Sequence, residues 1–143
     1  MENSLKPLVL LLVSILSFNL YSAVSYQKGM HTMEFNGKCS DNRPRSKDVH
    51  ITAIENAKKA AWNNYVAKFS AAKTGKYLQN RDSFTSNLDT YITEYAILET
   101  RCSKSKRTYT VALKASINQT MVDVILAQLS GSQGTSSAVA GQP

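Results

Sequence analysis

The chain has 143 residues, of which 43% are hydrophobic and 19% are charged, and its formal net charge is +7. This length fits one domain of ordinary size. The only long apolar stretch lies at the N-terminus, which excludes a protein that crosses a membrane several times.

Residues 1–23 have the order of a secretory signal peptide. Lys6 gives a basic start, Leu8–Leu16 forms a short apolar run, and small residues follow up to Ala23. The run is shorter than the roughly 20 residues of a membrane span. We therefore predict cleavage after Ala23 and a periplasmic or secreted mature protein without a membrane span. An uncleaved anchor is the alternative, because Tyr21 stands where signal peptidases prefer a small residue.

Export changes what the positive charge implies about partners. Cleavage removes Glu2 and Lys6, so that the mature chain is still +7. A basic cytosolic protein suggests nucleic acid, whereas the anionic partners outside the cytosol are cell-wall polymers, lipid head groups and acidic proteins. We predict an envelope protein or an anionic envelope polymer as the partner, and no nucleic acid. A solvated basic surface without a partner is the alternative.

The two cysteines, Cys39 and Cys102, form an even set. In an oxidising compartment such a pair predicts a disulfide. At period two, Cys39 shares a strand face with Met33, and Cys102 shares one with Ala96, so that both thiols can point into one core. A redox pair is less favoured, because such pairs usually have the spacing C-x-x-C.

The apolar pattern predicts six elements in the order β-α-α-β-β-α. They are a strand at 31–39, a helix at 49–72, a short helix at 82–91, strands at 95–103 and 107–117, and a helix at 119–129. Gly75 is the predicted stop after the long helix, and Asn118 is the predicted cap of the last one. A turn at 104–106 joins the last two strands in an antiparallel hairpin.

These elements predict one α+β domain at 31–129, with a small antiparallel sheet of about three strands and helices packed on one face. Residues 24–30 are predicted to be a leader. Residues 130–143 are small and polar, which is typical of a disordered tail or linker. The position of the first strand in the sheet stays open.

Two segments resemble a known family. The alanine-spaced segment 53–69 is followed by the segment 91–126, in which one strand ends in Leu113–Asn118. This arrangement is similar to the N-terminal domain of flagellar assembly protein T and to related small bacterial cell-envelope lipoproteins. The resemblance implies an envelope-associated scaffold or assembly module, and it carries over no catalytic residue.

The sequence offers no pattern of catalytic or metal-binding residues. His31 and His50 lack the partner spacing of a zinc site, and neither G-x-S-x-G nor a glycine-rich phosphate loop occurs. The carboxylates Asp82, Asp89, Glu94 and Glu99 have no spacing that would pair two of them in a cleft. We therefore predict a protein that is not an enzyme and needs no metal or cofactor.

Among the aromatic residues, Tyr77 and Tyr95 are expected to be exposed.

The densest basic cluster consists of Arg101, Lys104, Lys106 and Arg107 around the predicted hairpin turn. Such a cluster can dock an anionic partner, and a turn kept soluble by charge is the alternative. The sequence thus predicts a periplasmic, non-catalytic interaction or assembly module of the cell envelope. The alternative is a small secreted effector that binds a host or competitor target.

Overall fold

The computed structural model describes residues 22–131. Nearly all of the predicted signal peptide and most of the predicted tail lie outside the described residues. The elements in chain order are β1 (Val24–Glu34), β2 (Cys39–Ser40), β3 (Arg43–Pro44), α1 (Lys47–Val66), α2 (Ala71–Gln79), α3 (Arg81–Thr85), the 3-10 helix η1 (Leu88–Thr90), β4 (Ile92–Ser103), β5 (Thr108–Asn118) and α4 (Gln119–Gly131).

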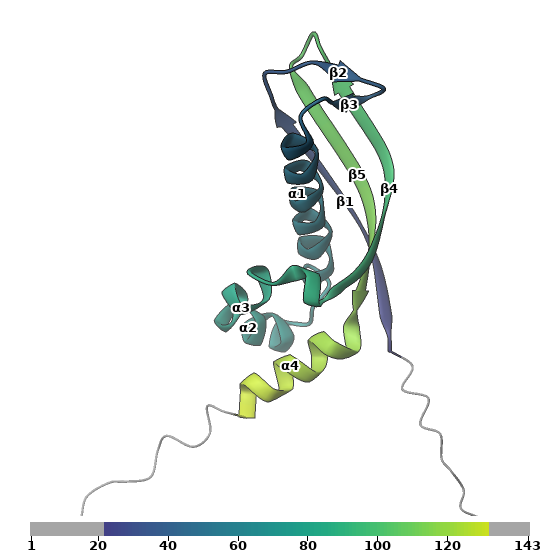
Figure 1. Ribbon diagram of the computed structural model, residues 1–143. Helices are drawn as coiled ribbons and strands as arrows, with labels where there is room; N and C mark the ends of the chain where they lie inside the picture. The colour runs from purple at the N-terminus through teal and green to yellow at the C-terminus, as the bar shows by residue number, and fades with distance from the viewer. Residues whose placement is uncertain (1–21, 132–143) are drawn as a thin grey trace, which may run out of the picture.

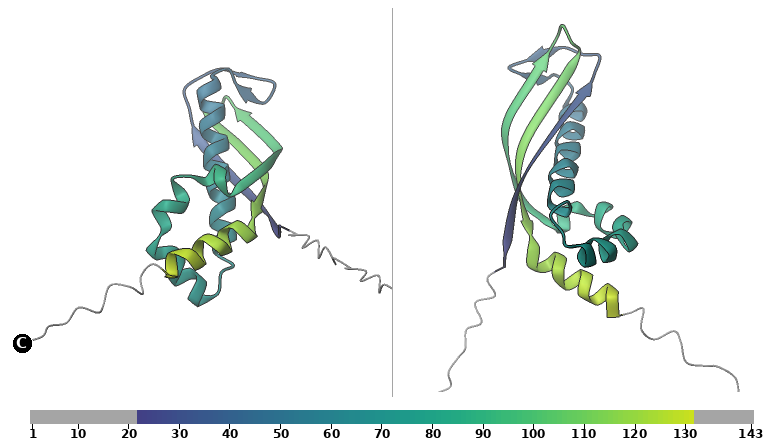
Figure 2. Two further views of the ribbon diagram at one scale, coloured as in Figure 1. Left: turned by 60° about the horizontal axis from the view of Figure 1, so that its bottom comes forward. Right: turned by 180° about the vertical axis from the view of Figure 1, so that it is seen from behind.

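The main sheet has three antiparallel strands in the order β1-β5-β4 (Figure 1). This order answers the question that the sequence left open: the first strand pairs with β5 at one edge, and β5 lies at the centre. β2 and β3 form a separate two-stranded hairpin at one end of the sheet. The predicted α+β fold is confirmed, with α1 packed along one face of the sheet (Figure 2).

The first strand begins seven residues earlier than predicted, at Val24, so that the predicted leader at 24–30 is part of β1. It also ends earlier, at Glu34 instead of residue 39. The start of the strand could not be predicted from the sequence because the apolar residues of this segment lie on the outer face of the sheet. Tyr26 and Met30 are 61% and 66% exposed, whereas Gln27 and Gly29 are the buried positions that face α1.

Gly29 sets the distance between β1 and α1. A Cβ at this position would lie 2.5 Å from Ala61 N, 2.8 Å from Ala61 Cβ, and closer still to the carbonyl oxygen of Ala57. Ala57 and Ala61 are fully buried, so that small residues on both elements bring the two backbones together. Figure 2 shows α1 running along the strands on this face.

The predicted helix at 49–72 is two helices. α1 ends at Val66, and α2 begins after Ser70, whose side chain accepts a hydrogen bond from Lys73 N. Gly75, the predicted stop, lies inside α2. The apolar pattern did not reveal the break because Phe69, between the helices, still packs against the core, with its ring edge-on to Tyr77 at 5.9 Å.

An aromatic cluster holds the short helices against the end of α1. Trp62 is fully buried and lies 5.6–6.2 Å, between ring centroids, from Tyr65, Tyr77, Phe84 and Tyr91. Its Nε1 donates a hydrogen bond to the Tyr77 hydroxyl at 3.0 Å. Tyr77 is therefore buried, at 4% exposure, and the expectation that it would be exposed is wrong. Tyr95 is 45% exposed, as predicted.

Side chains also cap α1 and α4, and the cap that the sequence predicted, Asn118, is one of them. The Ser46 side chain accepts from Val49 N at the start of α1, and Asn118 Oδ1 accepts from Met121 N at 3.0 Å at the start of α4. Within residues 22–131, no helix combines the length and the apolar character that a membrane crossing requires.

Candidate functional site

The predicted turn between β4 and β5 lies at one end of the molecule and carries Lys104, Lys106 and Arg107. Ser103 Oγ accepts a hydrogen bond from Lys106 N at 3.3 Å, and Arg107 has a positive φ of 52°. The Arg107 carbonyl accepts from Phe35 N at 3.0 Å. The turn is thus fixed both by its own residues and by the chain that leaves β1.

The β2–β3 hairpin brings further cations to the same end. Its two turn residues, Asp41 and Asn42, have φ angles of 50° and 60°, which is the conformation of a type I′ turn and suits Asp and Asn. Below the turn, Arg45 N donates to the Lys38 carbonyl at 2.9 Å. The sequence predicted only a polar loop at 40–47, although Asp41 and Asn42 were a signal for a two-residue hairpin.

The predicted disulfide between Cys39 and Cys102 is present and joins β2 to β4, with 5.9 Å between the Cα atoms. The prediction that both thiols lie on long strands was wrong for Cys39. Cys39 does not belong to the strand that contains Met33. In β4 a bulge at Leu98 reverses the alternation, so that Cys102 faces inward opposite Tyr109.

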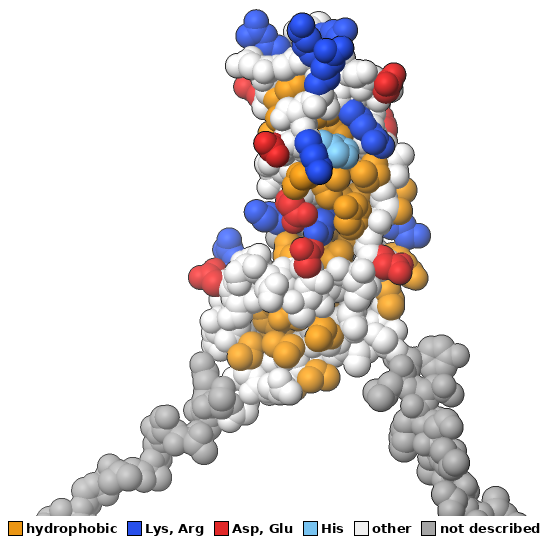
Figure 3. All heavy atoms as spheres, viewed as in Figure 1, with side chains coloured by type: hydrophobic (Ala, Val, Ile, Leu, Met, Phe, Trp, Pro, Cys, Tyr) orange, Lys and Arg blue, Asp and Glu red, His pale blue; other side chains and the backbone are white. Residues whose placement is uncertain are grey.

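We call this end of the molecule the basic tip. It comprises the exposed side chains of Lys38, Arg43, Arg45, Lys47, Lys104, Lys106 and Arg107. Figure 3 shows Lys and Arg side chains gathered there. Within residues 22–131 none of these seven forms an ion pair. Exposed acidic residues are also present in these segments, at Glu34, Asp41 and Asp48, but the cations outnumber them.

Arg101, the remaining residue of the predicted cluster, has a different environment. It lies on β4 opposite Thr110, and its Nη2 is 2.6 Å from Glu99 Oε1. The structure thus brings Lys104, Lys106 and Arg107 together with the hairpin, and it gives Arg101 a partner of its own. The sequence missed Lys38, Arg43 and Arg45, because only the disulfide and the hairpin bring them next to the turn.

The two histidines lie apart and have separate partners. His50 Nδ1 is 2.7 Å from the Tyr109 hydroxyl, and His31 Nε2 is 3.4 Å from Asn56 Nδ2. Burial and, secondarily, the positive charge of Arg43 lower the pKa of His50. Among residues 22–131, no three His, Cys, Asp or Glu side chains come together in a way that could hold a metal ion.

Asp89 and Glu99, two of the four carboxylates considered from the sequence, have separate cationic partners. Asp89 and Glu55 bind Lys58, whose side chain is 5% exposed, while Glu99 binds Arg101. Burial, the largest effect, acts to lower the pKa of Lys58, but its hydrogen bonds to Asp89 and Glu55 outweigh burial and raise that pKa. Lys58 is thus a buried, charged tie between α1 and η1.

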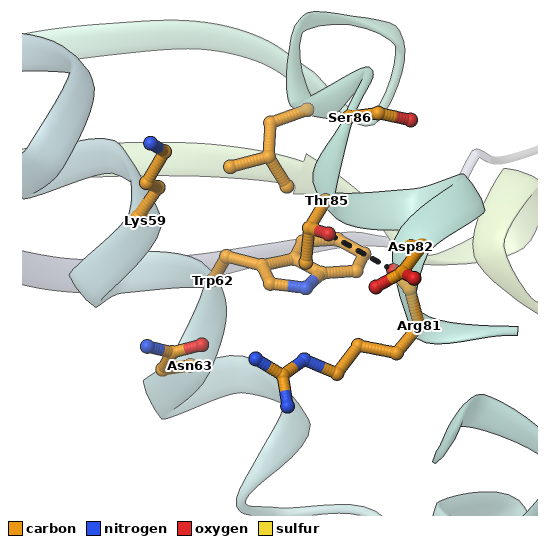
Figure 4. Close-up of a pocket in the computed structure, with 8 residues that line it drawn as sticks. Lys59, Trp62, Asn63, Arg81, Asp82, Thr85 and Ser86 are labelled. Carbon is orange, nitrogen blue, oxygen red and sulfur yellow. Dashed lines mark hydrogen bonds between the residues drawn. The ribbon is translucent and has the colours of Figure 1, made fainter. Parts of the chain in front are cut away.

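A shallow pocket of about 460 Å³ lies between α1 and α3, where Trp62 forms part of the wall (Figure 4). Lys59, Arg81 and Asp82 also line it. The Trp62 Nε1 is already bound to Tyr77, and Thr85 Oγ1 donates to the Arg81 carbonyl at 3.1 Å. The fixed polar groups of this pocket therefore serve the fold, and the basic tip is the stronger candidate site.

The chain matches no protein-family model, and no curated protein or solved structure is similar to it at a significant level. The similarity to the N-terminal domain of flagellar assembly protein T therefore stays a prediction from the residues of segments 53–69 and 91–126.

Proposed function

We propose that this chain is an exported, non-catalytic interaction module of the bacterial cell envelope that binds an anionic partner through the basic tip. The observation that carries the proposal is the tip itself, where the Cys39–Cys102 disulfide fastens one cationic segment beside another. Cations without ion-pair partners, held on a fixed scaffold, attract an anionic surface over a longer range than paired ones.

The disulfide also supports the proposed location outside the cytosol. Disulfides persist in the periplasm and outside the cell, and they are rare in the reducing cytosol. Together with the signal-like order of residues 1–23, the Cys39–Cys102 bond favours a periplasmic or secreted location. The partner is then an acidic envelope protein or an anionic envelope polymer.

Binding is favoured over catalysis by the way the reactive groups are used. His50, Asp89 and Glu99 each have a structural partner, and these partners lie on different elements. An enzyme of the acid–base or nucleophilic type needs such groups to converge on one point.

The proposal is tested with polyglutamate as an anionic probe and with vesicles that contain phosphatidylglycerol, each titrated at increasing NaCl concentration. We expect binding that weakens as salt is added. The variant K104S/K106S/R107N should weaken this binding about tenfold or more, since it removes three cations from the tip while keeping a residue that tolerates positive φ at position 107.

The matched control is K28S/K59S/K76S, which removes the same charge from exposed lysines outside the tip. The control should bind almost as well as the wild type. Equal losses in the two variants would show that net charge, and not the tip, determines binding, and would overturn the proposal.

Compartment is tested separately by the intact mass of the protein from a periplasmic extract, with and without reduction and alkylation. The mass of residues 24–143 with an alkylation-resistant disulfide is the expected result. A full-length mass with two free thiols would overturn the export part. Recovery mainly from the culture supernatant would favour the secreted effector over the envelope module.

A further inference from the structure

Strand β4 leaves one edge of the sheet open. It has 12 residues, and the only strand that is hydrogen-bonded to it is β5 (Figure 1); among the other described elements, η1 contacts it at its start and the β2–β3 hairpin contacts it near Cys102. Proteins usually blunt such an edge with proline, charge or a short strand. The middle of β4, Tyr95–Leu98, has neither proline nor charge, although the bulge at Leu98 interrupts its regularity.

The other edge is different, because polar side chains of α1 reach it. Asn64 Nδ2 donates to the Lys28 carbonyl at 2.9 Å, and Lys68 Nζ donates to Gln27 Oε1 at 2.8 Å. At the start of β1, the Ala23 backbone N–H donates to Thr120 Oγ1. Of the two edges, β4 is therefore the one whose backbone is available to another strand.

Apolar side chains accompany the open edge. α1 packs on β1 and β5 and leaves the middle of β4 largely exposed, although Ile92 at its start is buried and Lys58 Nζ of α1 lies 5.5 Å from the Tyr95 ring centroid. Tyr95, Ile97 and Leu98 are 45%, 36% and 53% exposed, and Ile51 on α1 is 45% exposed. Figure 3 shows hydrophobic side chains gathered between α1 and β4. A strand added at the edge would therefore lie beside apolar surface that is now exposed to water.

We propose that a second copy of this chain pairs with the first through antiparallel contact between the two β4 strands, which joins the two sheets into one. The charges of β4 fit this occupant. With the two-fold axis between Ile97 and Leu98, Glu94 lies opposite the partner's Arg101, and the symmetry repeats the pair. Each Arg101 guanidinium, which already holds Glu99 of its own chain, would then lie between two carboxylates. Opposite charges at facing positions stabilise an antiparallel pair, and like charges destabilise it.

The charges also select this register over its neighbours. A shift by two residues in one direction places Glu94 opposite the partner's Glu99, which is a repulsive pair. A shift by two residues in the other direction places Arg101 opposite the partner's Ala96. Of these three registers, only the one centred between Ile97 and Leu98 gives two attractive pairs and no repulsive one.

The bulge at Leu98 makes the faces of the two strands agree in this register from Glu94 to Arg101, and a second irregularity, between Ile92 and Glu94, lies outside this stretch. Tyr95 and Thr100 lie opposite Ala115 and Val111 of β5, which face inward, while Glu94 and Arg101 lie opposite Ser116 and Thr110, which face outward. Without the extra residue Leu98, an odd-numbered position could not share a face with an even-numbered one. With it, Tyr95 meets the partner's Thr100 on the inner face, and Glu94 meets the partner's Arg101 on the outer face.

The net charge of +7 does not oppose this dimer, because antiparallel pairing directs the two basic tips to opposite ends. The basic residues of the turn, Lys104–Arg107, lie beyond the end of β4, away from the proposed axis. The dimer would therefore present two distant cationic sites. This inference does not depend on the proposed function, since the paired residues lie outside the basic tip.

The test is the oligomeric state of the full-length gene product, purified as the cell processes it and measured by sedimentation velocity over a range of concentrations. We expect a monomer–dimer equilibrium. E94R should raise the concentration needed for dimerisation about tenfold, because two attractive pairs become repulsive. I97K should prevent dimerisation by placing two lysines at the axis. The triple variant E94R/E99R/R101E should restore it, because it exchanges the charges across the axis and keeps an ion pair between positions 99 and 101.

The control for charge is E34R, which makes the same change at an exposed position on β1, and the control for loss of apolar surface is M30K on the outer face. Both controls should dimerise like the wild type, and circular dichroism confirms that each variant is folded. A wild type that stays monomeric at every concentration would overturn the proposal. So would a dimer that E94R and I97K leave unchanged, or one that E94R/E99R/R101E does not restore.

Discussion

At the scale of single residues, this fold depends on how closely β1 approaches α1. Gly29 is buried against the backbone of α1 at Ala57 and Ala61. Gly75 provides the contrast, because a Cβ there would have no atom within 4 Å. At Gly29 a side chain has no room. At Gly75 a side chain has room, so that substitution there changes only the conformational entropy that glycine loses when it is fixed in a helix.

We predict that G29A lowers the free energy of unfolding by about 3 kcal/mol or more, because the added methyl group overlaps backbone atoms that cannot move independently. G75A should leave stability unchanged or raise it by up to about 1 kcal/mol, since alanine is the better helix former. Urea denaturation of the two variants measures both effects. A small loss in G29A would mean that α1 can shift away from the sheet at little cost.

His50 gives the stability of the protein a pH dependence with a defined sign. Its pKa lies below the ordinary value of 6.5 in the folded state, because of burial and then of Arg43. As the pH falls below 6.5, the unfolded chain binds a proton at this position more readily than the folded chain does. His50 therefore contributes to stability above its unfolded pKa, and this contribution is lost as the pH falls.

We predict that the free energy of unfolding, measured by urea denaturation from neutral pH to about pH 5, falls more steeply for the wild type than for H50N. R43S should also reduce the slope, because Arg43 is the second cause of the lowered pKa. If H50N and the wild type have the same slope, other groups determine the acid sensitivity and this assignment is wrong.

At the scale of elements, the sequence predicted those segments whose apolar alternation or capping is complete. β5 was predicted at 107–117 and is Thr108–Asn118, and the last helix was predicted at 119–129 and is Gln119–Gly131. Every inward residue of β5 from Tyr109 to Ile117 is apolar and fully buried. In such a strand the periodicity of two is directly visible in the sequence.

The elements whose bounds or geometry were predicted wrongly have a different cause. β1 has small or polar residues at inward positions because α1 lies so close to it, so that its sequence alternation is inverted. The break between α1 and α2 is invisible because Phe69 and Tyr77 continue the apolar pattern across it. The bulge at Leu98 in β4 is seen in its pairing with β5, and no residue of β4 predicts it from the sequence. Each of these features depends on a neighbour that local sequence does not contain.

At the scale of the whole molecule, the candidate site depends on one covalent link. The sequence predicted the cysteine pair and the cations of the turn. The hairpin residues lie beside that turn because Cys39 is bonded to Cys102, 63 positions away, and because β3 contacts β4 and α1. The hairpin is small, and Pro44 is its one buried residue. Without the disulfide, a short hairpin of this kind has little else to hold it beside β4.

We predict two effects of C39S/C102S. The free energy of unfolding should fall by about 4 kcal/mol in the chain-entropy description, because the unfolded chain regains the freedom of the closed loop. Binding to polyglutamate should weaken under conditions in which the variant is still folded, because Lys38, Arg43 and Arg45 are no longer held next to the turn. Denaturation and salt-dependent titration measure the two effects independently.

The comparison that decides the role of the hairpin is with R43S/R45S, which keeps the disulfide and removes two hairpin cations. If the hairpin acts as part of the basic tip, R43S/R45S and C39S/C102S should weaken polyglutamate binding alike, while only C39S/C102S loses the larger stability. If C39S/C102S is destabilised and binds polyglutamate as strongly as the wild type, the disulfide stabilises the fold alone. The anionic partner would then be bound by the turn at Lys104–Arg107 without the hairpin.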